Sequence, residues 1–130
     1  MTGATHMLAA AAIYKCVPLE KPVVLVIALA SHFLLDAIPH YELTKRTNYI
    51  LGILIGVFLL ITASLYNDTF LLIAAFLGAL PDLNTLFFKV QVFQNIHSRI
   101  HSKDVIYNPW LSVGAELSIS TVSIFVLTWH

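Results

Sequence analysis

The sequence predicts an all-α, polytopic membrane bundle of about five helices, of which four are expected to cross the membrane. Hydrophobic residues make up 58% of the 130 residues and charged residues 11%, whereas soluble domains are about a quarter charged. The mean hydropathy is +0.84. Long uncharged runs alternate with short polar segments, as repeated membrane crossings require. The length fits one integral-membrane domain over residues 1–130.

Two helices are expected in the N-terminal part of the chain. An alanine-rich segment over residues 5–17 begins at Thr5, which is a suitable cap. It is too short to span a bilayer comfortably, so it is expected to be partly embedded or packed against the other helices. After a turn that contains two prolines, the second helix is expected over about residues 21–38, where Pro39 ends it.

Two further helices are expected in the middle of the chain. Residues 49–66 contain no charged side chain and form the clearest transmembrane segment. The next helix is expected from residue 69 to about residue 90, with a kink at Pro81. This kink would aim the carboxylate of Asp82 toward the interior of the bundle.

A polar loop is expected at about residues 91–108, followed by a last helix over residues 109–129 with tryptophan near both ends. With this topology, two basic residues fall on one side of the membrane, Lys15 and Lys21. Five fall on the other, which the positive-inside rule makes cytoplasmic: Lys45, Arg46, Lys89, Arg99 and Lys103.

The second helix carries a stripe of metal-ligating residue types. His32, Asp36 and His40 recur at every fourth position, so they share one helix face. Ionisable side chains beside an apolar run are costly and need a partner. A divalent metal suits this combination of imidazole and carboxylate, and the single cysteine excludes a site built from thiolates.

Further candidate ligands are expected at the same end of the bundle. The spacing His97-x-x-x-His101 puts two imidazoles on one side of a helix, and His6 and His40 reach the same face of the membrane. Asp82 is expected well inside the bilayer, with its carboxylate aimed inward. The predicted ligands are more than one tetrahedral zinc ion uses, so the sequence predicts one or two divalent ions, with zinc preferred. The predicted metal set is His6, His32, Asp36, His40, Asp82, His97 and His101.

Other interpretations of these residues stay open. His32 can be a buried histidine bonded to a backbone carbonyl or to Asp36, and Asp82 can cap a helix after a break at Pro81. The His97 and His101 pair can be solvated surface residues. Glu116, isolated inside the last helix, is a candidate general base, a further ligand or the ion-pair partner of Arg99.

Four segments of the chain together carry a family resemblance: Thr5-His6, the run from His32 to Asp36, the run from Ala79 to Asn84, and the run from His97 to Ser102. They resemble the YdjM-like family of membrane-bound, metal-dependent hydrolases, described as LexA-binding and inner-membrane-associated, in bacteria and archaea. The resemblance implies a helical membrane protein with hydrolase activity at His6, His32, Asp36, Asp82, His97 and His101.

This chain departs from the family pattern at two places. Asn84 stands where the family has an acidic residue, and the Arg-Gly pair before the last Thr-His-Ser is absent. Loss of one carboxylate would reduce a two-metal site to one metal or leave an inactive binding protein. The pair His32 and Asp36 is also similar to the helix ligands of zinc-dependent phospholipases C and P1-type nucleases, which points to phosphoester chemistry.

The predicted function is a membrane-embedded metal-dependent hydrolase. Metal-activated water would attack an ester, most simply a phosphoester of a lipid or amphiphile at the cytoplasmic headgroup level. Asp36 and Glu116 are the candidate catalytic residues, as acceptors of the proton. The alternative is a membrane protein for metal or proton transport or sensing, without hydrolase activity. Net charge is zero and no phosphate-binding loop occurs, so no nucleic-acid partner is predicted.

Overall fold

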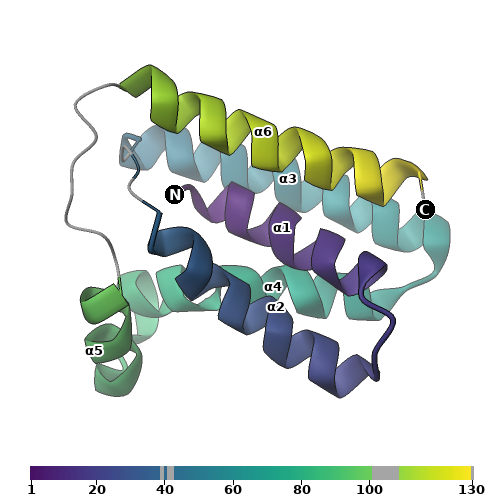
Figure 1. Cartoon of the computed structure of the whole chain (residues 1–130), viewed down its shortest axis with the longest axis horizontal. Coiled ribbons are helices and arrows are strands. Elements are labelled where there is room, and N and C mark those ends of the chain that lie inside the picture. Colours follow the sequence, from purple (N-terminus) through teal and green to yellow (C-terminus); the bar gives the residue numbers. More distant parts are fainter. Residues whose placement is uncertain (39, 41–42, 101–108, 130) are drawn as a thin grey trace.

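The computed structural model describes residues 1–38, 40, 43–100 and 109–129, and over these ranges it is helical, without a strand. This confirms the all-α fold class. The described α-helices, labelled in Figure 1, are α1 (Gly3–Cys16), α2 (Lys21–Asp36), α3 (Lys45–Tyr66), α4 (Thr69–Leu83), α5 (Gln91–Ile100) and α6 (Pro109–Trp129). A π-helical turn, η1 (Asn84–Phe88), follows α4.

Helix α1 lies at the centre of the bundle and packs against α2, α3, α4 and α6 (Figure 1). Apolar residues occur on every side of α1, as expected of a helix that is surrounded by others. Ala4, Ala9, Ala10 and Ala11 are at most 8% exposed. Their small side chains let four helices approach one axis. The short first helix is therefore packed against its neighbours, one of the two outcomes that its length predicts.

Helix ends differ from the expected ones by a few residues. Thr2, not Thr5, caps α1, because its Oγ1 accepts a hydrogen bond from the Thr5 amide at 3.2 Å. Helix α2 ends at Asp36, earlier than residue 38. Helix α3 begins at Lys45 rather than residue 49, since the side chain of Thr44 caps it.

Helix α4 contains Pro81 and continues to Leu83, where it passes into η1. The turn ends at Lys89, whose φ of 53° is left-handed, close to the expected end near residue 90. Asp82 thus lies inside a continuous helical path and does not cap a new helix. The predicted polar loop holds α5 in its first part, because the polar and apolar residues there lie on opposite faces of a helix.

Within the described residues, two helices, α3 and α6, are long and apolar enough to cross a membrane, judged by length and composition. Four were expected. Helices α2 and α4 have 16 and 15 residues, so each is about 22–24 Å long, less than the roughly 30 Å of a hydrocarbon core. Helix α3 turns several large apolar side chains outward, among them Ile53, Leu54 and Leu65.

Candidate metal centre

Three side chains from α1 and α2 meet in the interior of the bundle: His6, His32 and Asp36. Each residue is at most 1% exposed. His6 Nε2 lies 3.1 Å from Asp36 Oδ1, and His32 Nε2 lies 3.0 Å from Asp36 Oδ2. The centroids of the two imidazole rings are 4.0 Å apart. One ligand atom from each residue lies within 4.8 Å of the other two, so the group can hold a metal ion.

The second ring nitrogen of His32 fixes the tautomer that the neutral imidazole adopts. His32 Nδ1 lies 2.8 Å from the carbonyl oxygen of Gly78 on α4, and a carbonyl accepts but cannot donate, so Nδ1 carries the proton. In the neutral imidazole, Nε2 then presents its lone pair to Asp36. A backbone carbonyl behind a histidine in this way is a common support for a metal ligand.

Gly78 makes this contact possible because it lets α4 approach α1 closely. A Cβ atom at Gly78 would lie 2.5 Å from the Cβ of Ala10 and 2.6 Å from the carbonyl oxygen of His6. Neither distance is sterically possible without a shift of the helices. Gly78 is not among the residues predicted for the site from the sequence. Its position one helical turn before Asp82, on the same face, is the signal that would have identified it.

Asp82 stands beside the three-residue group and faces a cavity. Its Oδ1 lies 3.7 Å from His32 Nε2, and its side chain is 29% exposed. The cavity has a volume of about 520 Å³ and is bounded by residues of α1, α3, α4 and η1, with Asp36 and Asp82 in its wall. The centre is thus buried on the side of His6 and His32 and open on the side of the two carboxylates.

The spacing of these atoms fits a small cation. Ligands at 2.0–2.1 Å from a tetrahedral ion are about 3.3–3.4 Å apart. The distances from Asp36 to the Nε2 atoms of His32 and His6, 3.0 and 3.1 Å, are slightly shorter than that value, and the distance of 3.7 Å from His32 Nε2 to Asp82 is slightly longer. Two carboxylates with two neutral imidazoles carry a charge that a divalent cation balances. The residues present therefore fit a divalent metal.

Burial acts on the charge of His6. The pKa of its imidazole is lowered below the ordinary value mainly by burial, against the opposing effect of Asp36. Neutral imidazole is the form that ligates metal. His6 Nδ1 is buried and has no hydrogen-bond partner in the described part of the chain. The α-amino nitrogen of Met1 also approaches Asp36 Oδ1, at 3.6 Å.

The structure does not bring every predicted ligand into this group. His40 is buried but lies beyond the end of α2, and its Nδ1 donates to the carbonyl of Ile38 at 2.8 Å; it is not part of the three-residue group. The side chain of His97 and the whole of His101 lie outside the described residues, so their role as ligands stays a prediction. Asn84 is buried and pairs with the backbone of Val90 at 3.0 and 3.3 Å.

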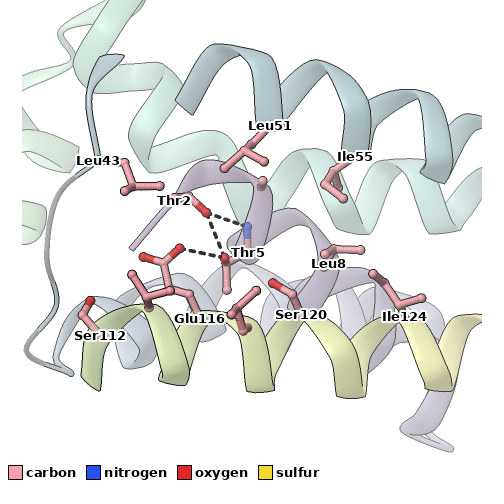
Figure 2. A pocket seen from close by; sticks show the side chains of 13 residues that line it. Thr2, Thr5, Leu8, Leu43, Leu51, Ile55, Ser112, Glu116, Ser120 and Ile124 are labelled. Atoms are coloured by element: carbon pink, nitrogen blue, oxygen red, sulfur yellow. Dashed lines mark hydrogen bonds between the residues drawn. The ribbon is translucent and has the colours of Figure 1, made fainter. Parts of the chain in front are cut away.

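Glu116 contacts a different face of α1 from Asp36, at Thr5 and not at His6. It accepts a hydrogen bond from Thr5 Oγ1 at 3.3 Å and lines a separate cavity between α1, α3 and α6 (Figure 2). The structure therefore does not bring together the two predicted catalytic residues, Asp36 and Glu116. Their catalytic roles stay predictions.

No protein-family model, no curated protein and no solved structure matches this chain. The resemblance to the YdjM-like family thus remains an interpretation of four short segments. What can be said of function comes from the geometry of the site.

Proposed function

We propose that this protein is a membrane-embedded, metal-dependent hydrolase whose divalent cation, by preference zinc, is held by His6, His32 and Asp36. The observation that carries the proposal is the convergence of His32 Nε2, held by the Gly78 contact of the same ring, on the carboxylates of Asp36 at 3.0 Å and Asp82 at 3.7 Å. Oxygen and nitrogen lone pairs at 3.0 and 3.7 Å need a cation between or beside them. A proton on His32 neutralises one carboxylate, whereas a divalent ion neutralises both.

The cation, when bound, supplies Lewis acidity that activates water and polarises the ester under attack. Asp36 contacts both imidazoles and is almost fully buried, which suits a ligand. Asp82 is partly exposed and faces the cavity, which suits a group that accepts a proton from water. We therefore assign proton acceptance to Asp82 in preference to Glu116, which contacts a different face of α1.

The cavity favours an amphiphilic substrate. Its wall combines the two carboxylates with apolar side chains that include Met7, Ile53 and Phe87. A phosphoester of a lipid or amphiphile can place its polar group at the carboxylates and its alkyl part along α3. Anionic phosphate beside carboxylates requires a cation between them, which agrees with the proposed metal.

The position of the site supports a cytoplasmic orientation. The N-termini of α1, α3 and α6 lie at the same end of the bundle as the C-terminus of α2 (Figure 1). Lys45 and Arg46 begin α3 at that end, and Lys15 and Lys21 lie at the other. By the positive-inside rule, the end that holds the metal centre would face the cytoplasm, in the inner membrane.

The neighbours of the centre favour an enzyme over a transport pathway. Beyond His6 and His32, toward the other end of the bundle, the interior is filled by Ala10, Ala28 and Ala74. An ion pathway needs polar groups that continue across the membrane. The described residues that pack between α1, α2 and α4 at this level are apolar, so they offer no such polar groups.

The test is hydrolysis by the purified protein, loaded with Zn²⁺ and incubated with phospholipid vesicles, with products identified by mass spectrometry. We expect a zinc-dependent product from the wild type and from Asp68→Asn, a matched carboxylate variant at the opposite end of the bundle. We expect at least a 100-fold lower rate from His32→Ala, as for loss of a group that holds the reaction centre. An equal rate from His32→Ala, or the absence of any metal-dependent product, would contradict the proposal.

A further inference from the structure

A second cavity lies beside another face of α1, about 100° around the helix from His6, and shares Ala4 of its lining with the cavity at the metal centre. It has a volume of about 220 Å³ and is lined by residues of α1, α3 and α6 and by Leu43 (Figure 2). Most of its lining is apolar, including Leu8, Leu51 and Ile55, and its polar groups include Thr5 and Glu116. It shares no carboxylate with the cavity at Asp36 and Asp82. It is therefore a separate candidate binding site.

The polar end of this cavity presents an acceptor. Thr5 Oγ1 donates to Glu116 Oε2 at 3.3 Å, so its proton cannot also serve Thr2, and the Thr2 hydroxyl must donate to Thr5 at 2.8 Å. Figure 2 shows these contacts as a chain that runs from Thr2 through Thr5 to the carboxylate of Glu116. Both threonine hydroxyl protons are thus in use. A carboxylate offers about four acceptor positions, and Thr5 takes one. A ligand that donates a hydrogen bond is complementary to this end.

Access to the cavity is lateral. Helices α3 and α6, which bound it, are the two that are long and apolar enough to cross a membrane. Both pack on α1. Leu117 lines the cavity and is 63% exposed, so the wall reaches the outer surface of the bundle. In a bilayer, this opening faces the alkyl chains of lipid.

We propose that this cavity binds the alkyl chain of a single-chain amphiphile whose head group donates a hydrogen bond to Glu116. A volume of about 220 Å³ is below the roughly 300–1,000 Å³ of sites for drug-sized ligands, so it suits one chain and not two. A hydroxyl head, as in a long-chain alcohol or a monoacylglycerol, and an ammonium head, as in an alkylamine, share this chemistry. A fatty acid would bring a second carboxylate to Glu116 and is disfavoured.

The experiment uses the whole purified chain in detergent and a decanol analogue that carries a photoreactive diazirine on its alkyl chain. Labelled peptides are mapped by mass spectrometry, and decanol, decylamine and decanoate compete for labelling. We expect labelling of α3 and α6 at the cavity, with decanol and decylamine competing at least tenfold better than decanoate. A larger effect of decylamine identifies the ammonium as the preferred head, and an equal effect identifies the hydroxyl as sufficient.

Two variants test the place of binding and its chemistry. Leu51→Trp fills the cavity and should lower labelling at least fivefold, whereas Leu54→Trp, which adds the same bulk on the exposed face of α3, should leave labelling unchanged. Glu116→Leu should weaken competition by decanol about tenfold, as for loss of a hydrogen bond to a charged group, and should abolish the discrimination against decanoate. Unchanged labelling of Leu51→Trp, or decanoate competing as well as decanol with the wild type, would overturn the proposal.

Discussion

Thr5 and His6 are consecutive residues of α1, yet their side chains belong to two different environments. His6 faces a buried group of imidazoles and carboxylates shared with α2 and α4, whereas Thr5 faces a mostly apolar cavity shared with α3 and α6. Consecutive residues on a helix differ by about 100° in direction. Two neighbouring residues of one central helix can therefore face different environments, one the polar metal centre and the other the apolar cavity.

The two sides also differ in how closely the helices approach α1. On the side of the metal centre, Gly78 brings the backbone of α4 into contact with α1, and the ligand atoms are 3.0–3.7 Å apart. On the other side, α1, α3 and α6 leave a cavity of about 220 Å³. Close contact of α4 with α1 fixes the positions of the metal ligands, whereas α3 leaves room beside α1 both in this cavity and in the cavity of about 520 Å³ at Asp36 and Asp82.

The largest effect is expected from Gly78→Ala, which acts on the closely packed side. The added Cβ would lie 2.6 Å from the carbonyl oxygen of His6, so α4 must move away from α1. We expect a loss of about 1–3 kcal/mol of stability from overpacking, together with loss of metal. Thermal unfolding and elemental analysis measure the two effects.

The matched control for this change is Gly56→Ala in α3, where a Cβ meets nothing within 4 Å. We expect it to keep the metal and to raise stability by about 0.5–1 kcal/mol, because alanine favours a helix over glycine. If both glycine variants behave alike, close approach at Gly78 does not position the site.

The next effect separates the two faces of α1. His6→Gln should weaken metal binding by more than about 100-fold, because a ligand contributes more than a supporting group does. The same change should leave the binding of the decanol probe within twofold of the wild type. Zinc titration and photolabelling of one preparation measure both. Loss of probe binding in this variant would show that the two sides are not independent.

Thr5→Val is expected to have a smaller effect, on the affinity for decanol and not on metal binding. This change removes the hydroxyl that donates to Glu116 and should change decanol affinity by about two- to tenfold, as for one ordinary hydrogen bond. Metal content should stay at the wild-type level. A fall in metal content would mean that Thr5 supports the metal centre and not the cavity.

The smallest effect concerns the far end of the bundle. Tyr14 donates to Asp68 at 3.0 Å, and burial followed by this hydrogen bond raises the pKa of its phenol to about 12. The folded protein favours the protonated phenol, so this interaction stabilises the folded state fully below pH 10. The stabilisation is lost as the pH rises through about 12. The difference in tyrosinate absorbance between the wild type and Tyr14→Phe should titrate near 12; a midpoint near 10 would contradict this assignment.

The sequence predicts the part of the site that depends on helical spacing. His32 and Asp36 are one turn apart on a run that is clearly helical, so their shared face follows from the period alone. His40 continues the same spacing, but α2 ends at Asp36 before reaching it. A spacing argument holds only as far as the helix extends, and helix ends are its least reliable part.

Other features depend on contacts between distant segments and are not visible in local patterns. The central position of α1 arises because small alanines admit neighbours on all sides, and an apolar helix without a distinct polar face gives no direction for packing. Gly78 matters through its distance to Ala10 and His6, which sequence cannot supply. Glu116 is isolated in sequence, and only the fold shows that it pairs with Thr5.

The central claim is that His6, His32 and Asp36 hold a divalent cation, and metal content tests it most directly. The wild type, Asp36→Asn and Asp68→Asn are loaded with Zn²⁺, freed of excess metal and analysed for zinc per chain. We expect about one ion in the wild type and in Asp68→Asn, and less than about a tenth of that in Asp36→Asn, since the latter alone loses a ligand. Equal zinc in Asp36→Asn and the wild type, or no bound zinc in the wild type, would contradict the account.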